Sequence, residues 1–402
     1  MYSSGIFCLA SGALMVFLRE CVDMKSGNTI IKPYQKEGLN FFLKRLFFFI
    51  SVISISVCFG LNNKPNSKIR KNEMKNQNIS FGTWTQYLNK SDAELLTFIQ
   101  KYKDAGITHY FIHANPQQLK KIVALTKNMG INIHGWIWTL NRPGDKVAME
   151  NPGWYSVNRN GQNSYDFRPY VDYYQWLSPF SQGAREHIKE LIHEIAEIDG
   201  LASVHLDYVR YSDVILPVNL QPKYGLVQNN EMPQFDFGYH PEARKRYKEI
   251  YDIDPFELEH PELNRNWLEF RLDAVTSLVN DLVEIAHMNG TKLSAAVFPF
   301  PEISRRTVRQ DWSAWNLDIA CPMNYHHFYN EDLDWIKFSV ENGVKETGGR
   351  FDYFSGLFVN ALTPQELKLA ITKSIEGGAN GINFFSIHSL TDEHLDIIRS
   401  FR

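Results

Sequence analysis

The chain has 402 residues and a formal charge of −3, but its charge is unevenly distributed. Residues 1–78 carry eleven Lys/Arg against four Asp/Glu, a net of +7, whereas residues 79–402 carry 31 bases and 41 acids, a net of −10. An acidic folded part argues against a phosphate-binding surface, and so against a nucleic-acid partner. Hydrophobic residues make up 44% of the chain, which excludes disorder for its bulk. The 324 residues from 79 to 402 fit two domains or one α/β barrel.

An uncharged apolar run from Leu46 to Leu61 follows the basic pair Lys44-Arg45. It is shorter than the roughly 20 residues of a membrane span, and it fits the core of a signal peptide better. Within it, Ile55-Ser56-Val57-Cys58 resembles a bacterial lipoprotein cleavage box, although Val57 stands where a small residue is usual. We therefore predict that residues 1–61 are a signal peptide or a membrane anchor, with a lipid at Cys58 or an uncleaved helix as the alternatives.

Two neighbouring stretches complete this interpretation. An earlier apolar patch, Gly5 to Leu18, makes a tandem of two export segments, which indicates that the gene start is over-extended. Asn62 to Asn78 is polar and lacks apolar periodicity, so we expect a flexible tether. The folded part is then exported and membrane-anchored, in the periplasm or at the cell surface. It contains one cysteine, Cys321, and so no internal disulfide is possible.

From residue 79 onward, short β-rich runs alternate with amphipathic helices, the pattern of a parallel α/β fold. Ser91 to Glu94 reads as a helix-capping box, and Thr363-Pro364 as a cap followed by proline. No GxGxxG fingerprint follows the first strand, which disfavours a dinucleotide-binding fold. We predict a single (β/α)₈ TIM barrel with strands at Ser80–Trp84, His109–His113, Asn132–Thr139, Ser203–Tyr211, Lys292–Phe298, Ile319–Asn324, Tyr353–Val359 and Gly381–Ile387.

Two connections of this barrel are unusually long. Gln162 to Ser178 follows the third strand and Ser212 to Gly238 follows the fourth, both with little periodicity. Long loops in compact domains usually serve function, and barrel active sites lie at the carboxyl ends of the strands. These enlarged loops are therefore expected to wall a substrate cleft.

The fourth strand carries the clearest chemical motif, His205-Leu206-Asp207-Tyr208-Val209-Arg210-Tyr211. Alternation puts His205 and Asp207 on one face, and an acid among apolar barrel positions needs a partner or a function. We predict that Asp207 points into the cleft as a catalytic carboxylate, held ionised by Arg210. The alternative is a structural Asp–Arg pair inside the barrel.

Glycoside hydrolysis needs a second carboxyl group, because one group protonates the leaving oxygen while the other attacks or activates water. Glu302 comes directly after the fifth strand, and Asp311 follows one helix later beside Trp312. Either could serve as the partner of Asp207. Glu302 could instead cap a helix, and Asp311 could be a buried acid that binds backbone amides.

Polar and aromatic residues near the predicted strand ends suit sugar binding. Cys321-Pro322-Met323-Asn324-Tyr325 ends the sixth strand with two possible hydroxyl ligands. No set of residues has the spacing of a metal site, since neither His326-His327 nor His193-Glu194-Ile195-Ala196-Glu197 can hold an ion. We expect no cofactor and no metal, and the predicted substrate-binding residues are Arg210, Asn324, Tyr325, Trp84, Trp138, His205 and Trp312.

Taken together and in order, several motifs resemble the glycosyl hydrolase-like family 10, a group of exported bacterial barrels. They are Gly82-Thr83-Trp84, His134-Gly135-Trp136-Ile137-Trp138, Asn151-Pro152-Gly153-Trp154, Trp176-Leu177-Ser178-Pro179, the motif around Asp207, Gln310-Asp311-Trp312-Ser313-Ala314-Trp315 and Pro322-Met323-Asn324-Tyr325. The resemblance implies a glycosidase barrel. Asp207 is followed by Tyr rather than by a second acid, which leaves Asp311, Glu302 or the loop acids Asp166 and Asp172 as its partner.

The sequence thus predicts a membrane-tethered glycoside hydrolase that acts on a polysaccharide or cell-envelope glycan. A second hypothesis is a non-catalytic glycan-binding lipoprotein that keeps the barrel but has lost one acid.

Overall fold

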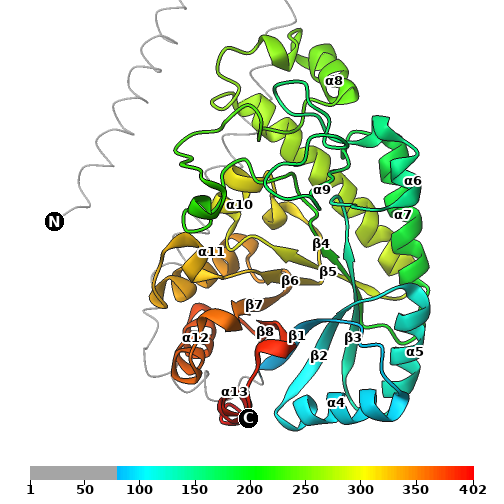
Figure 1. Cartoon of the computed structure of the whole chain (residues 1–402), viewed down its shortest axis with the longest axis vertical. Coiled ribbons are helices and arrows are strands. Elements are labelled where there is room, and N and C mark those ends of the chain that lie inside the picture. Colours follow the sequence, from blue (N-terminus) through cyan, green and yellow to red (C-terminus); the bar gives the residue numbers. More distant parts are fainter. Residues whose placement is uncertain (1–78) are drawn as a thin grey trace, which may run out of the picture. The chain divides into compact units, whose positions relative to one another are not determined.

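A computed structural model of the chain describes residues 79–402. Residues 1–78 lie outside this range, and with them the predicted signal segment, Cys58 and the tether. Eight parallel strands close into a barrel in chain order, which confirms the predicted TIM barrel (Figure 1). Their bounds are β1 Ser80–Gln86, β2 Ile107–His113, β3 Asn132–Trp138, β4 Ser203–Asp207, β5 Lys292–Val297, β6 Ile319–Pro322, β7 Asp352–Phe358 and β8 Gly381–Phe385.

Helices cover the outside of the barrel, and their starts follow the predicted signals. Ser91 and Thr363 cap α4 and α12 through complete capping boxes, each with a Glu three residues later. The helices are α4 Asp92–Asp104, α5 Pro116–Thr126, α6 Lys146–Met149, α7 Gln182–Ala196, α8 Pro241–Tyr251, α9 Arg265–Met288, α10 Pro301–Val308, α11 Asp334–Thr347, α12 Pro364–Gly377 and α13 Asp392–Arg399. None of the helices within residues 79–402 is both long and apolar enough to cross a membrane.

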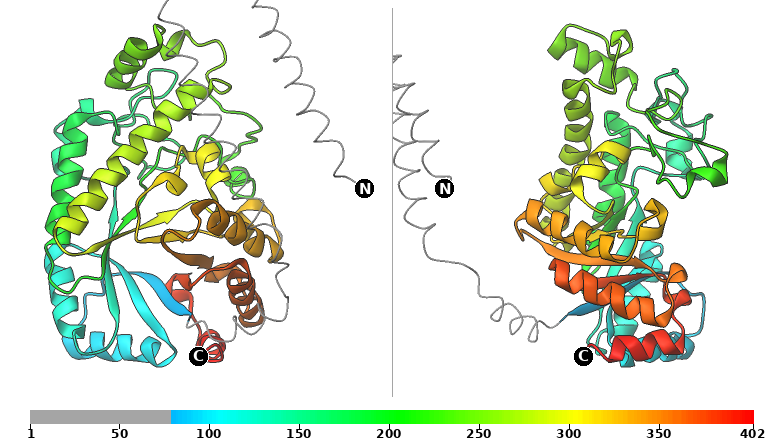
Figure 2. Two further views of the ribbon diagram at one scale, coloured as in Figure 1. Left: turned by 180° about the vertical axis from the view of Figure 1, so that it is seen from behind. Right: turned by 90° about the vertical axis from the view of Figure 1, so that its left-hand side faces the viewer.

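The long segments after β3 and β4 form an elaboration on the barrel. The first runs through α6 to α7, and the second leads to α8 and the 24-residue helix α9 before the chain returns to β5. Figures 1 and 2 show α8 at one end of the folded part, with α4 and α13 at the other end.

Strand β4 ends four residues earlier than the alternation pattern predicts. Tyr208 adopts φ +49°, a left-handed conformation that is rare for a non-glycine residue and cannot continue a strand. The backbone still pairs with the neighbouring chain beyond β3, because Thr139 N donates to Asp207 O and Leu140 N donates to Tyr208 O. Asp207 is therefore the last residue of β4, at the carboxyl end of the barrel.

The apolar core has two parts. Most buried side chains pack between the sheet and the helices, while a smaller set fills the barrel interior. The interior set consists of Trp84, Phe111, Trp136, Ala296, Ile319, Cys321 and Phe354.

Three histidines are buried with this interior set and are joined by a continuous chain of hydrogen-bond contacts. His109 Nδ1 lies 3.0 Å from His134 Nε2, and His134 Nδ1 lies 2.7 Å from the Ser203 hydroxyl. That hydroxyl contacts the Ser294 hydroxyl at 2.7 Å, which in turn lies 2.8 Å from His205 Nδ1. Alternation put His205 on the same face as Asp207, and the two serines supply the partners that buried imidazoles require.

Burial is the main cause of low pKa values in this histidine chain. The pKa of His109 falls to about 4 and that of His205 to about 3, while that of His134 lies well below its usual range. A neutral imidazole therefore fits the folded state, whereas the unfolded chain takes up protons near pH 6.5.

We expect the protein to lose stability steeply as pH falls from about 6.5 towards 4. Each buried histidine contributes about 1.4 kcal/mol per pH unit in this window, since the unfolded state binds a proton that the folded state excludes. Urea unfolding at several pH values measures the slope. His205→Gln should reduce it, whereas His193→Gln on the exposed face of α7 should not; equal slopes in both variants would contradict the prediction.

Candidate active site

Asp207 stands at the mouth of the barrel with both carboxylate oxygens held by N–H donors. The indole Nε1–H of Trp136 donates to Oδ2 over 3.1 Å, and the backbone N–H of Tyr208 donates to Oδ1 over 2.7 Å. The backbone of Tyr208 itself is left-handed, with φ +49°. Strained backbone of this kind costs about 1–3 kcal/mol and is found preferentially at functional sites.

Burial raises the pKa of Asp207 to about 6, although the Tyr208 N–H, the positive charge of Arg210 and the Trp136 N–H all act to lower it. The sequence predicted that Arg210 holds this carboxyl group ionised. The charge of Arg210 does lower the pKa of Asp207, but desolvation raises it by more. The Asp207 side chain is half-buried, so part of it remains exposed to solvent. A carboxyl group that titrates near neutral pH is suited to acid–base or nucleophilic chemistry.

Two aromatic residues, Trp136 and Tyr208, donate hydrogen bonds to this carboxylate, and further aromatic rings pack against Tyr208. Trp138 packs edge-on against Tyr208 with ring centroids 5.0 Å apart, and it also contacts Tyr173, which is 45% exposed. Tyr325, which follows β6, packs against Phe385. Burial raises the pKa of Tyr325, and the charge of Asp207 raises it further, so its hydroxyl keeps its proton and can donate a hydrogen bond.

Arg210, three residues after Asp207, is buried. Its Nη1 donates to Asp213 Oδ2 over 3.2 Å and to the carbonyl of Tyr211 over 2.8 Å. The guanidinium lies 4.9 Å from the ring centroids of Trp176 and Phe298, and it is 6% exposed. This burial leaves Arg210 a cation enclosed by aromatic rings and neutralised by Asp213.

Asp213, the ion-pair partner of Arg210, was not predicted from the sequence. Its side chain also accepts a hydrogen bond from the Tyr174 hydroxyl over 3.2 Å, and its carbonyl accepts one from Tyr170 over 2.8 Å. Both Asp207 and Asp213 raise the pKa of Tyr208, whose main shift comes from burial. The spacing of Arg210 and Asp213, three residues apart, was the available sign of this pair.

Asp311 and Glu302 have other surroundings. Asp311 Oδ1 accepts from Arg305 over 2.9 Å and from the Ser313 hydroxyl over 2.7 Å, among the outer helices. Glu302 is exposed on α10, and no hydrogen bond or ion pair within residues 79–402 involves it. The loop acids Asp166 and Asp172 are exposed as well. None of these four has a hydrogen bond to a residue that holds Asp207.

The predicted sugar ligands divide between the mouth and deeper layers. Tyr325 and Trp138 lie at the mouth. Trp84 and His205 lie one layer down, where the Trp84 indole donates to His205 Nε2 over 2.9 Å. Asn324 is buried between β6, β7 and the helices and bonds to Ser355 and Ser339. The ring of Trp312 packs against Phe351 and Tyr353 outside the barrel.

The described chain offers no obvious metal site. Within residues 79–402, no three His, Cys, Asp or Glu side chains are grouped so that they could hold an ion. His327 stacks on Phe358 with ring centroids 4.8 Å apart.

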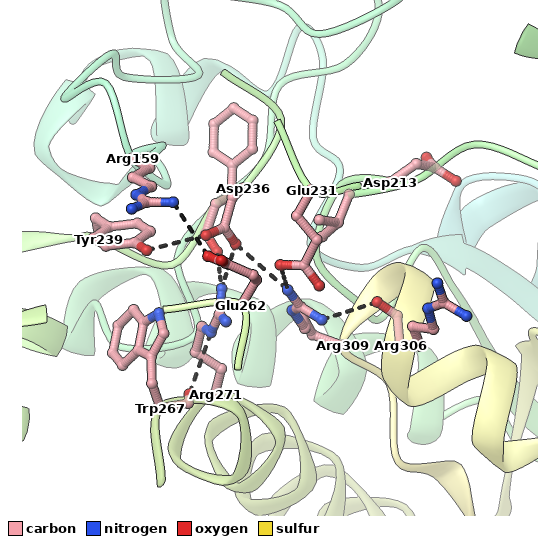
Figure 3. Close-up of polar contacts among 12 residues, drawn as sticks. Arg159, Asp213, Glu231, Asp236, Tyr239, Glu262, Trp267, Arg271, Arg306 and Arg309 are labelled. Atoms are coloured by element: carbon pink, nitrogen blue, oxygen red, sulfur yellow. Dashed lines mark hydrogen bonds and ion pairs between the residues drawn. The ribbon is translucent and has the colours of Figure 1, made fainter. Parts of the chain in front are cut away.

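A buried ion network fastens the loop after β4 to the helices (Figure 3). Asp236 Oδ1 accepts from Arg271 of α9 over 2.5 Å and lies 3.7 Å from Arg309, which also pairs with Glu231. The Tyr239 hydroxyl donates to the other oxygen of Asp236 over 3.0 Å. Burial alone would raise the pKa of Asp236, but the two arginines outweigh it and lower the pKa.

Solved glycoside hydrolases share this fold. The glycoside hydrolase domain of PgaB (BpsB) from Bordetella bronchiseptica is 14% identical, with a TM-score of 0.60 over 80% of this chain and 98% of that one. The β-amylase catalytic domain of Paenibacillus polymyxa is 11% identical, with a TM-score of 0.56 over 81% of this chain and 98% of that one. A β-galactosidase from Marinomonas ef1 is 13% identical, with a TM-score of 0.55 over 80% of this chain and 58% of that one.

Neither a scan of protein-family models nor a search of curated protein sequences found a match to this chain. The structural likeness, at such low identity, shows that residues 79–402 have a barrel fold of the kind that glycoside hydrolases use.

The ion network around Asp236 allows a test of what holds the segment after β4 in place. We expect Asp236→Asn to lower the free energy of unfolding by about 3–5 kcal/mol, because it leaves Arg271 buried without its carboxylate. Glu269→Gln removes one carboxylate from the exposed Arg265–Glu269 pair of α9 and should leave stability unchanged. Chemical unfolding of both variants makes the comparison, and equal effects would refute the role of the network.

Proposed function

We propose that the protein is a glycoside hydrolase in which Asp207 is the catalytic carboxylate. The observation that carries this proposal is a carboxyl group at the carboxyl end of β4, with a pKa raised to about 6 and aromatic side chains around it. Catalytic groups of TIM-barrel enzymes lie at this face, and pKa values near the working pH are typical of such groups.

The hydrogen bonds at Asp207 favour its ionised form as the active one. Both oxygens accept from fixed N–H donors, which bind a carboxylate more strongly than a carboxylic acid. Above pH 6 Asp207 can attack the anomeric carbon or stabilise the positive charge that develops there. The Tyr325 hydroxyl is a donor for the sugar next to it.

Protonation of the leaving oxygen requires a second acid. Asp311 and Glu302 stay in consideration from the sequence, and the structure adds Asp213. Asp213 lies near Tyr208, as Asp207 does, but it is 3% exposed and ion-paired with Arg210, so it fits a structural carboxylate better than a proton donor. We therefore rank Asp213 behind Asp311 and Glu302.

The proposed substrate is a polysaccharide or a cell-envelope glycan. Trp138, Tyr173 and Tyr325 offer ring faces or edges at the mouth, and aromatic surfaces suit the apolar faces of sugar rings. The carbohydrate enzymes among the fold neighbours support this class. Membership of the glycosyl hydrolase-like family 10, export, and anchoring by a lipid at Cys58 or by a helix are further parts of the proposal, based on the sequence.

A non-catalytic glycan-binding protein is the second candidate function. It is favoured by the placement of Asp311 and Glu302, which leaves Asp207 without either predicted partner among its hydrogen-bonded neighbours. Glycan binding without product release, in the wild type, would select this candidate.

We expect Asp207→Asn to abolish hydrolysis of a glycan that the wild type cleaves. The substitution keeps the shape of the side chain but removes the charge, so the fold should persist. Product analysis after incubation with plant, host and peptidoglycan-derived glycans measures turnover, and circular dichroism checks the fold. Undiminished hydrolysis by this variant would refute the assignment.

The same assay separates the possible proton donors. Of Asp311→Asn, Glu302→Gln and Asp213→Asn, one of the first two should reduce kcat by about 100-fold or more, as expected for loss of general acid catalysis. A leaving group that needs no protonation, such as nitrophenol, should restore the rate of the variant that lacks the acid. If neither Asp311→Asn nor Glu302→Gln shows this pattern, neither residue is the donor.

A further inference from the structure

Trp136 is one of the two residues that donate a hydrogen bond to the Asp207 carboxylate. It belongs to β3 and pairs in register with His205 of β4, two residues before Asp207. Its ring is 9% exposed, packs with the barrel-interior set, and stands edge-on to His113 with ring centroids 5.5 Å apart. The strand and these neighbours fix the direction in which its N–H points.

An indole nitrogen is a donor only, so its effect on a carboxyl group has a definite sign. The Trp136 N–H stabilises Asp207 more when that group is charged, because charge-assisted hydrogen bonds are stronger than neutral ones. The Trp136 ring has the opposite effect, since it helps to exclude water from the carboxylate. One side chain thus both desolvates the charge and compensates for part of the cost.

We propose that Trp136 is a positioning residue that fixes the orientation of the Asp207 carboxylate and sets the pH at which this group loses its proton. This inference rests on the proposed function for its catalytic meaning. Its physical content, the coupling of an indole N–H to the ionisation of Asp207, is independent of any turnover.

Nuclear magnetic resonance on ¹⁵N-tryptophan- and ¹⁵N-tyrosine-labelled protein tests the coupling directly. The Trp136 indole N–H and the Tyr208 backbone N–H should titrate together with a midpoint near pH 6, since they donate to the two oxygens of one carboxyl group. Both shifts should disappear in Asp207→Asn. Absence of a common titration in the wild type would overturn the inference.

Trp136→Phe then isolates the hydrogen bond from the ring. Phenylalanine keeps much of the desolvation but has no N–H, so the Tyr208 amide should titrate roughly one pH unit higher. Trp138→Phe is the matched control, because Trp138 is two residues along the same strand and its Nε1 has no hydrogen-bond partner within the described residues. An unchanged midpoint in Trp136→Phe, or an equal shift in Trp138→Phe, would refute the role of Trp136.

The pH profile of hydrolysis links the coupling to catalysis. The acidic limb should move upward in Trp136→Phe by the same interval as the Tyr208 amide midpoint. If the amide shifts while the wild type cleaves no glycan, the coupling stands and the proposed function fails. If glycans are cleaved but the limb does not follow the amide, the catalytic meaning assigned to Trp136 is wrong while the hydrolase proposal stands.

Discussion

Most polar groups that this barrel buries have hydrogen-bond partners, and the need for such partners organises the described part of the chain. The barrel interior meets it with serine hydroxyls between imidazoles. The loop after β4 meets it with two arginines around Asp236. At Asp207 the requirement is met by two N–H donors, yet their contribution does not compensate fully for burial, and the pKa stays raised. Asp207 is therefore unlike Asp236, whose partners overcompensate.

The contrast between these two aspartates separates structural from reactive carboxylates in this chain. Asp236 is surrounded by permanent positive charge and is 2% exposed, so its charge is fixed and no substrate can reach it. Asp207 has neutral donors on both oxygens, remains half-buried, and has its nearest cation committed to Asp213. A carboxylate that is oriented but not neutralised is free to respond to a positive charge on a substrate.

The sequence predicted the eight strands and the position of Asp207 at the carboxyl end of the fourth, because alternation and strand order are local patterns that the barrel obeys. It assigned side chains to a face of the sheet but not to a depth within the barrel. Trp84 and His205 face inward as expected, yet they lie a layer below the mouth. The surroundings of Asp311 and Asn324 depend on where β6 ends and how α10 runs, and Asp213 lies in a loop without periodicity. None of these can be read from residue spacing alone.

The histidine chain has a consequence for where hydrogen atoms lie. The Trp84 indole can only donate, so neutral His205 must carry its proton on Nδ1 and donate it to Ser294. Asn132 stands at the other end of the chain, where its amide nitrogen donates to His109 Nε2 over 3.3 Å. His109, His134 and Ser203 then each donate to the next member, towards Ser294. Two runs of hydrogen bonds with opposite polarity then meet at the Ser294 hydroxyl, whose own hydrogen is left with the Val204 carbonyl at 3.4 Å. The longest bond of the chain is thus the place where its two directions converge.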